Sequence, residues 1–294
     1  MSLTTRRITN KIAQISFFLA TTITTLTTVL IILFIFIQAI RPFLANNNYG
    51  SYPVINFIIG DSWRPRIEIF GIGYMIISTI VATIYSVLIG TVVSLGVAAF
   101  FVECLPKCLR NILHFFIECL ATIPSVFYGI FSILIIVPVI REISPYPQGE
   151  SLLSVIIVLA IMILPTICLI TIDALEKVDI KHKEGSYALG ASTRQTIIFV
   201  MFPVAKKGIL TGISLGITRA IGETMAVSLV AGNRESGFVR SPFETVRLLT
   251  TNIALEQSYA TGIHAQLLFS TAFTLLLIIF IINVILQKII NGAK

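Results

Sequence analysis

The sequence predicts an all-α polytopic membrane protein with six transmembrane helices and both termini in the cytoplasm. Its residues are 56% hydrophobic and only 12% charged, and its mean hydropathy is +0.95, whereas soluble domains carry about 25% charged residues. Apolar runs long enough to cross about 30 Å of hydrocarbon recur along the chain. We place the spans at about 16–40, 71–102, 112–138, 151–174, 208–231 and 264–287.

The first span follows a basic N-terminus, as a signal peptide would. Its apolar stretch, however, is longer than the 7–15 residues of a signal peptide and has no clear small-residue cleavage site. We therefore interpret it as a retained helix. The second span is too long for a straight crossing and is expected to begin as an interfacial segment or to tilt. In the third span, Pro124 removes a backbone donor and is expected to kink or break the helix.

The distribution of lysine and arginine orients these spans. Thirteen of the 21 basic residues fall in the N-terminus, the 103–111 and 175–207 loops and the C-terminal tail, and seven fall in the other three loops. All nine lysines are in the first group. Because basic residues collect on the cytoplasmic side, we assign the first group to the cytoplasm. The net charge of +7 then reflects topology, and no nucleic-acid partner is expected.

Small residues recur every four positions in the second and fifth spans, which places them on one face of each helix. Such faces let helix backbones approach closely in lipid. We expect a tightly packed core and a partner subunit. The fifth span carries Gly208, Gly212, Gly216, Ala220, Thr224, Ser228 and Gly232 on this spacing, and the second carries Ser78, Ala82, Ser86, Gly90, Ser94 and Ala98.

The fifth span also contains two charged residues, in the stretch GISLGITRAIGETMAVSLVAG. Arg219 lies about 16 Å of helix rise from the start of the span, and Glu223 follows about one turn later, so we expect the two side chains to pair. A charge at the centre of a membrane helix is disfavoured by roughly 2.5–3.5 kcal/mol. Either the pair only locks helices together, or it lines a water-filled path with Thr224, in which Arg219 binds an oxyanion or acts in a gate.

The sequence contains no signal for enzymatic or metal chemistry. The four cysteines lack C-x-x-C spacing and are expected to be reduced thiols. There is no phosphate-binding loop of the form G-x-x-x-x-G-K-[ST], so the chain itself is not expected to hydrolyse ATP. His114 and Glu118 are also four residues apart and are most simply interfacial. We therefore assign no catalytic residue, no metal site and no bound cofactor.

The cytoplasmic loop, about residues 176–207, has the pattern of two short helices linked by Gly190, which can adopt the positive φ of a helix stop, with Ser192 or Thr193 capping the second. It resembles the EAA motif of ABC importer permeases, in which E-A-A is followed after three residues by glycine and after nine more by I-x-L-P. Glu184, Gly190 and Pro203 hold their places. The departures are Gly185 and Ser186 for the two alanines, Val200 for isoleucine and Phe202 for leucine.

Two further strings, "ECLATIPSVFYGI" and "TRAIGETMAV", resemble the permease subunits of the phosphate importers, and the second is closer to the PstC-type subunit than to its PstA-type sister. The resemblance covers roughly residues 71–287. It implies the MetI-like fold of type I ABC importers, an N-terminal part over 1–70, a permease core over 71–287 and a cytoplasmic tail over 288–294.

The resemblance also implies a mechanism and a set of partners. The chain would be a multi-pass permease of the bacterial inner membrane that moves inorganic phosphate into the cytoplasm. It would pair with a PstA-like permease, receive phosphate from an extracytoplasmic binding protein, and be driven by a PstB-like ATPase dimer that uses ATP and Mg²⁺. Glu184, Gly190 and Pro203 would belong to the surface that couples to the ATPase, and Arg219 and Glu223 to transport.

Three alternatives remain open from the sequence. The first is the PstA-type sister or a permease for another oxyanion. The second is an ion-coupled secondary transporter, in which Arg219 and Glu223 would form a substrate or proton relay, although no internal duplication is evident. An anion channel with an arginine selectivity element is the third. Dependence of transport on a co-purifying ATPase distinguishes the ABC permease from the last two.

Overall fold

The computed structural model describes residues 3–44 and 51–292, and it describes no side chains for residues 3–10, 12 and 107. Parts of the predicted cytoplasmic tails, residues 1–2 and 293–294, and part of the first predicted outer loop, residues 45–50, lie outside the described residues.

The described chain is almost entirely helical. The long helices are α1 (Leu3–Ile40), α3 (Gly73–Glu103), α4 (Lys107–Thr122), α7 (Leu152–Glu176), α11 (Lys206–Gly222) and α14 (Gly262–Gly292). Shorter helices are α2 (Val54–Ile59), α5 (Ser125–Phe131), α6 (Val137–Ile143), α8 (Ile180–Ala188), α9 (Thr193–Thr196), α10 (Phe202–Val204), α12 (Met225–Val230) and α13 (Leu249–Glu256). Strands β1 (Trp63–Arg64) and β2 (Ile69–Phe70) form an antiparallel hairpin around the 3₁₀-helix η2 (Pro65–Ile67), and η1 (Arg41–Phe43) is a further 3₁₀-helix.

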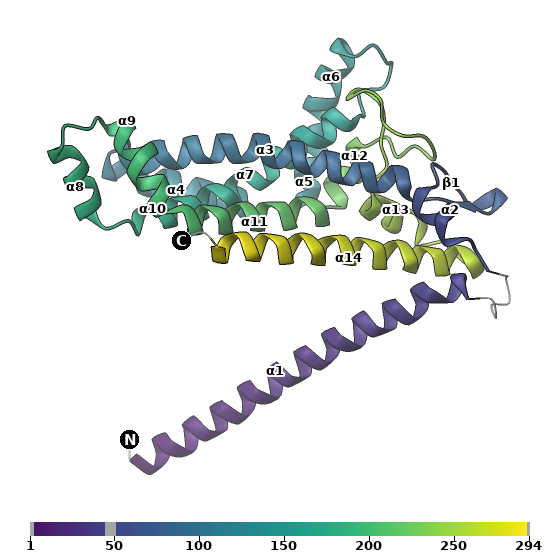
Figure 1. Ribbon diagram of the computed structural model, residues 1–294, viewed down its shortest axis with the longest axis horizontal. Coiled ribbons are helices and arrows are strands. Elements are labelled where there is room, and N and C mark those ends of the chain that lie inside the picture. The colour runs from purple at the N-terminus through teal and green to yellow at the C-terminus, as the bar shows by residue number, and fades with distance from the viewer. Residues whose placement is uncertain (1–2, 45–50, 293–294) are drawn as a thin grey trace.

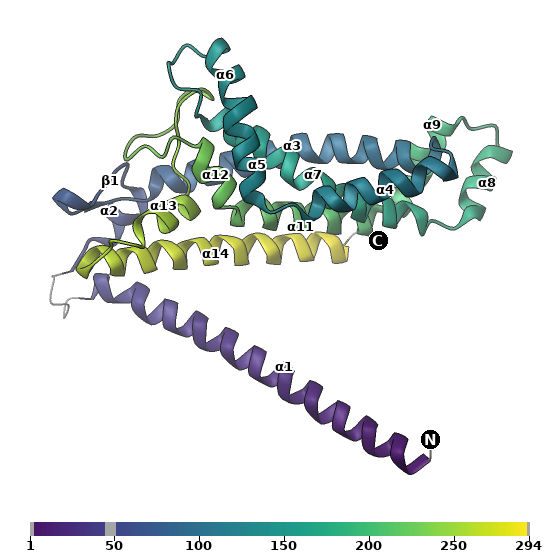
Figure 2. The same cartoon turned by 180° about the vertical axis from the view of Figure 1, so that it is seen from behind.

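Helix α7 occupies the centre of the molecule, between α3 and α11 and beside α4 (Figure 1). Its most apolar window is 67% buried, a larger share than for any other candidate span among the described residues. Helices α8 and α9 lie at one end of the bundle, and the hairpin, α2 and α13 lie at the other, as the reverse view also shows (Figure 2). Helix α1 begins and α14 ends on the side that carries α8 and α9.

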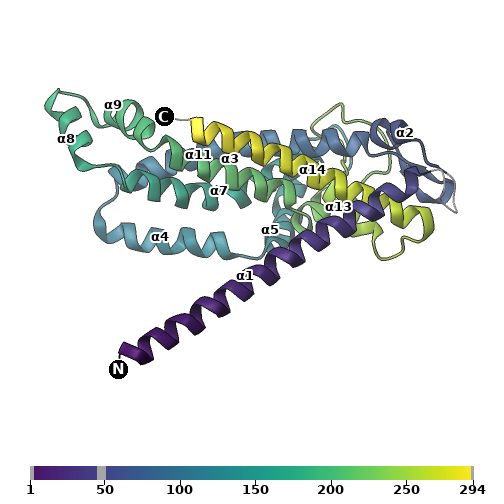
Figure 3. The ribbon, with the colours of Figure 1, turned by 60° about the horizontal axis from the view of Figure 1, so that its bottom comes forward.

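Helix α1 packs on α14 near its C-terminal end and diverges from the bundle toward its N-terminus (Figure 3). At the contact with α14, the Phe34 ring lies 5.7 Å from the Phe269 ring, and Ser270 Oγ donates a hydrogen bond to the Ala39 carbonyl at 2.7 Å. The remainder of α1 exposes large apolar side chains. These side chains fit contact with lipid or with another apolar helix.

Six spans are present when one bent pair of helices is taken as a single crossing. Five helical segments in the described chain are long and apolar enough to cross a membrane, and the sixth is the pair 193–204 and 206–222, which is bent by 75°. The predicted spans at 112–138 and 208–231 are wrong as continuous helices. The first breaks at Ile123 and Pro124, which leaves 125–143 as the candidate span, and the second breaks at Glu223 and Thr224.

The structure contains two π-helical turns, and each comes shortly before a proline. Turn η3 (Ser132–Ile136) precedes Pro138, and turn η4 (Ile197–Met201) precedes Pro203. A proline inside a helix has no N–H to donate, and its ring clashes with the carbonyl four residues earlier. Widening of the preceding turn accommodates this clash without ending the helix. Pro203, the last residue of the EAA-like pattern, therefore shapes the entry to the bend before α11.

The small-residue faces of α3 and α11 both pack on α7. A Cβ built at Gly90 would lie 2.9 Å from Ile163 Cγ1, and one built at Gly216 would lie 2.7 Å from the Ile167 side chain. Gly208 and Gly212 approach the side chains of Ala174 and Ile170 in the same way. Ser94 Oγ, also buried, donates to the Leu164 carbonyl of α7 at 3.0 Å. Ser86 and Ala220 are buried on the same two faces.

Replacement of Gly90 by leucine is expected to lower the stability of the purified protein, because the new side chain overlaps Ile163. Overpacking of this kind typically costs about 1–3 kcal/mol. Gly96 lies on the same helix but faces open space, with no atom within 4 Å of a built Cβ, so Gly96→Leu is the matched control. Thermal unfolding in detergent should show a lower Tm for Gly90→Leu only, and equal Tm values for the two variants would contradict the packing described.

Candidate functional site

Arg219 lies near the end of α11, about 20 Å of helix rise after the first residue of that helix. Its Nη1 donates to Thr166 Oγ1 at 2.7 Å and to the Ala121 carbonyl at 3.5 Å. Thr166 follows Pro165, which interrupts the backbone bonding inside α7, and Ala121 lies in the last turn of α4. The arginine therefore joins α11 to α7 beside Pro165 and to the end of α4, just before the break at Ile123 and Pro124.

Glu223 and Thr224 form the break between α11 and α12. Glu223 ends α11 with φ −71° and ψ 129°, and its Oε1 accepts a hydrogen bond from the Ala226 N–H in the first turn of α12 at 3.1 Å. Thr250 of α13 donates to the Glu223 carbonyl at 2.9 Å. The carboxylate thus satisfies one donor of the new helix, and Thr250 satisfies one acceptor of the break.

The expected ion pair between Arg219 and Glu223 is absent from the ion pairs of the described residues. The expectation was wrong because it assumed one continuous helix. Since α11 ends at Gly222, the backbone turns away before Glu223, and each side chain bonds to different partners. Arg219 and Glu223 are both partly exposed. An arginine has five N–H donors, and the hydrogen bonds above use only those on Nη1.

The two broken spans pack directly on each other. A Cβ at Gly129 of α5 would lie 2.7 Å from Leu229 Cδ1 and 3.0 Å from the Ala226 Cα of α12. Tyr128 Oη donates to the Leu120 carbonyl at 2.7 Å and so satisfies an acceptor at the end of α4. The strings "ATIPSVFYGI" and "TRAIGETMAV" are therefore brought together, although about 90 residues separate them.

The 176–207 loop folds as helix, glycine turn and helix. Gly190 has a φ of +80°, and Ser192 is the N-cap of α9, where it forms a capping box with Gln195. The prediction of a left-handed glycine followed by a capped helix is therefore confirmed. Glu184 lies exposed on α8, and Pro203 lies in α10 just before the 75° bend into α11.

The same loop exposes apolar side chains at the end of the molecule. Leu189 is 90% exposed and Phe199 is 73% exposed, and α8 has no buried residue. Nothing lies within 4 Å of a Cβ built at Gly190. Exposed apolar groups of this kind, rimmed by polar residues, are typical of a surface that contacts another protein.

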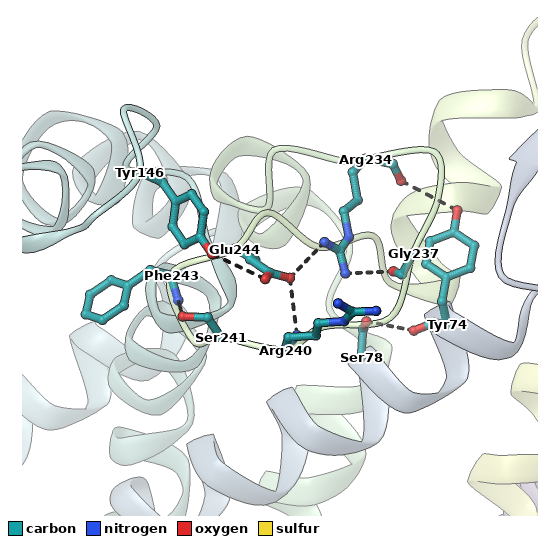
Figure 4. Close-up of polar contacts among 9 residues, drawn as sticks. All are labelled: Tyr74, Ser78, Tyr146, Arg234, Gly237, Arg240, Ser241, Phe243 and Glu244. Carbon is teal, nitrogen blue, oxygen red and sulfur yellow. Dashed lines mark hydrogen bonds and ion pairs between the residues drawn. The ribbon is translucent and has the colours of Figure 1, made fainter.

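At the opposite end, the segment 231–248 covers the start of α7 and the hairpin. Its carbonyls at Glu244 and Pro242 accept from the N–H groups of Leu152 and Leu153, which satisfies donors at the N-terminus of α7. The Glu244 carboxylate accepts hydrogen bonds from the Arg234 guanidinium at 3.0 Å, the Arg240 N–H at 3.2 Å and the Tyr146 hydroxyl at 3.4 Å. Figure 4 shows these three groups around it.

These contacts set the ionisation of Glu244. Burial acts to raise the pKa of its carboxyl group, but the hydrogen bonds and positive charge supplied by Arg240 and Arg234 outweigh burial and hold that pKa below its usual value. The charged carboxylate therefore joins the 231–248 segment to the α6–α7 loop through Tyr146.

An open cavity of about 1030 Å³ lies between the hairpin and the junction of α13 and α14. Its walls carry charges of both signs, from Arg64, Arg66, Glu68, Glu235 and Glu256, beside Tyr259 and His264. At the buried side of this site, Arg247 Nη2 pairs with Glu256 Oε1. Of the arginines in the predicted outer loops, Arg234 and Arg247 form ion pairs and Arg240 is exposed.

The cysteines and the other polar pair lie apart from the contacts described above. The four cysteines are free thiols, and no group of three or more metal-ligating side chains occurs among the described residues. His114 Nδ1 lies 3.4 Å from Glu118 Oε1 on α4, and both side chains are at least 36% exposed.

Residues 96–292 match the family described as "Binding-protein-dependent transport system inner membrane component". The chain belongs to this family. It is 35% identical to the probable ABC transporter permease protein YqgH of Bacillus subtilis, over 90% of this chain and 86% of that protein. It is 31% identical to the phosphate transport system permease protein PstC of Pasteurella multocida, over 84% of each chain.

Solved permease structures share the fold. A bacterial ABC transporter that imports the polysaccharide alginate matches with a TM-score of 0.66 at 13% identity, over 97% of this chain and 98% of that chain. The methionine transporter MetNI matches with a TM-score of 0.59 at 17% identity, over 76% of this chain and 98% of that chain. The predicted MetI-like permease fold is therefore confirmed. As an ABC importer permease, the chain is neither a secondary transporter nor a channel.

The sequence did not reveal which residues bond to Arg219 and Glu223 in this permease. Thr166 and Thr250 are ordinary polar residues in apolar segments, and nothing in their spacing relates them to Arg219 or Glu223. The only available signals were Pro124 and Pro165, which mark irregular backbone near Ala121 and Thr166. Lys183 and Glu103, which form an ion pair 80 residues apart, were likewise not identified.

Acid is expected to weaken the Glu244 network of the permease. Because the folded-state pKa of Glu244 lies below the unfolded value of about 4.3, its stabilisation is complete above that value and is lost as the pH falls through the folded pKa. Glu244→Gln should therefore lower the Tm at pH 7, by roughly 2–4 °C for each kcal/mol lost, and the two Tm curves should converge in acid.

The control for this pH series is Glu235→Gln, because Glu235 is an exposed carboxylate of the same segment with no ion pair in the described chain. Its Tm should follow the wild-type curve at every pH. A difference between wild type and Glu244→Gln that persists unchanged into acid would show that the carboxylate charge is not responsible.

Proposed function

We propose that this permease subunit imports inorganic phosphate, in an assembly with a PstA-like permease, a PstB-like ATPase dimer and an extracytoplasmic phosphate-binding protein. Several relatives named as phosphate transport system permease protein PstC support this, at 27–33% identity over most of the chain. The observation that carries the proposal is that Arg219 of α11 bonds both to Thr166 of α7 and to the Ala121 carbonyl at the end of α4.

The chemistry of Arg219 suits a phosphate path. A guanidinium presents a planar fork of donors that matches two oxygens of a phosphate. Thr166 and Ala121 hold Nη1 and so fix the plane of the group, while Nε and Nη2 remain to donate to an anion. Glu223 and Thr224 lie at the adjacent break, where a carboxylate near the path would favour a protonated phosphate or release of the anion.

The 176–207 loop is proposed to lie in the cytoplasm and to seat in a groove of the ATPase, with both termini on the same side. The exposed Leu189 and Phe199 supply apolar contact area for such docking, and Gly190 sets the angle between α8 and α9. At the other end, the cavity between the hairpin and α13 is the proposed contact for the phosphate-binding protein, since its charges of both signs offer partners for a polar protein surface.

Loss of the Arg219 charge is expected to abolish phosphate uptake without preventing assembly. In proteoliposomes that contain the complete complex, Arg219→Gln should reduce ATP-dependent uptake of labelled phosphate at least about tenfold, since charge-assisted hydrogen bonds contribute roughly 1.5–3 kcal/mol. Glu223→Gln should also reduce uptake. Arg141→Gln is the control, because Arg141 is an exposed arginine on α6 without an ion pair in the described residues. Wild-type uptake by Arg219→Gln would refute the path assignment.

A change of backbone conformation at Gly190 is expected to uncouple ATP hydrolysis from transport. At a φ of +80° a leucine is strained, so Gly190→Leu should change the angle between α8 and α9 while the spans stay folded. Gly190→Asn is the control, since asparagine tolerates this conformation. The ratio of phosphate moved to ATP hydrolysed should fall for leucine and be largely retained for asparagine; equal ratios would remove Gly190 from the coupling surface.

A further inference from the structure

Lys183 of α8 forms an ion pair with Glu103, the last residue of α3. The two side chains are 22% and 10% exposed, so the pair is largely shielded from solvent. It is the only ion pair of α8 in the described part of the chain, and it joins α8 to α3. The Ser186 hydroxyl, by contrast, bonds to Thr196 of the neighbouring helix α9.

Because the pair is shielded from solvent, each charge needs the other to compensate it. A carboxylate removed from water is disfavoured unless a positive charge compensates it, and the attraction between two charges strengthens as the local dielectric constant falls. Because α8 buries no residue of its own, it has little apolar packing to hold it on the bundle. The position of α8 relative to α3 therefore depends strongly on this contact.

Helix α3 connects this ion pair to the opposite end of the molecule. Its 31 residues correspond to about 46 Å of helix, and α3 runs beside α7 along this length (Figure 1). Near its other end, Thr79 Oγ1 accepts a hydrogen bond from the Leu249 N–H at the start of α13 at 3.2 Å. The next residue of α13, Thr250, donates to the Glu223 carbonyl at 2.9 Å.

We propose that Lys183 and Glu103 are a positioning pair that transmits displacement of α8 through α3 and α13 to the break at Glu223. The pair acts at a distance and touches no substrate. This inference rests on the proposed docking of the 176–207 loop on an ATPase. It assigns to α3 the role of the rigid connection between that docking surface and the broken span beside Arg219.

The test measures phosphate uptake and ATP hydrolysis in the same proteoliposomes that contain the complete complex. Lys183→Met should lower the ratio of phosphate moved to ATP hydrolysed at least about fivefold, the lower end of typical coupling between sites, while the ATPase co-purifies in the wild-type amount. Lys183→Arg should keep the ratio, because the charge is retained. Lys183→Glu combined with Glu103→Lys should restore much of the ratio that each single change removes.

Lys181→Met is the matched control, since Lys181 lies on the same helix with an exposed side chain that forms no ion pair in the described residues. It should behave as wild type. A wild-type ratio for Lys183→Met overturns the inference, and so does a lower uptake explained entirely by loss of bound ATPase. Absence of phosphate uptake by the wild-type complex is a different result, because it overturns the proposed function itself.

Discussion

A helix that ends within an apolar region leaves backbone carbonyl and N–H groups that lipid cannot satisfy, and this constraint organises the centre of the permease. Two spans are interrupted, at Ile123 and Pro124 and at Glu223 and Thr224. The groups left by each break find partners on other segments: Arg219 and Tyr128 donate to carbonyls at the end of α4, and Thr250 donates to the carbonyl of Glu223. Polar side chains are therefore gathered where the breaks lie, and the proposed anion path would use the same polar groups that complete the backbone bonding.

The interrupted spans are supported by a core that allows little variation in spacing. Glycines of α3 and α11 bring these helices against α7 from two directions, at distances that a Cβ would not permit. In lipid, where hydrophobicity does not drive helices together, such close van der Waals contact is the main source of association. The core thus fixes where Arg219 meets Thr166, because α11 presents the first and α7 the second. The small-residue faces therefore set the position of Arg219 as well as the spacing of the helices.

The sequence predicted much of this architecture, for physical reasons that differ between its parts. Span number and fold class followed from apolar length, and the conformation of Gly190 followed from the glycine between two helical segments, because both are local properties. The pairing of Arg219 with Glu223 was predicted on the assumption of an uninterrupted helix and was wrong. The stretch around Gly222 contains no proline, and Gly222 by itself did not predict a break. Contacts from α13 and α5, which come from distant parts of the chain, hold the backbone there. Partners such as Thr166 are equally non-local.

The distribution of tight and loose contacts determines where this permease can move. Sliding of α3 or α11 along α7 would bring a glycine face onto larger side chains, so the three helices resist relative displacement. The backbone at Glu223 and Thr224 has no such restriction, because a few hydrogen bonds rather than interdigitated side chains hold it. Hinges are typically a few residues at the ends of elements that absorb changes in φ and ψ. A force applied to α8 and carried by a stiff α3 is therefore expected to be expressed at the break next to Arg219, since the packed core between these two points yields less than the break does.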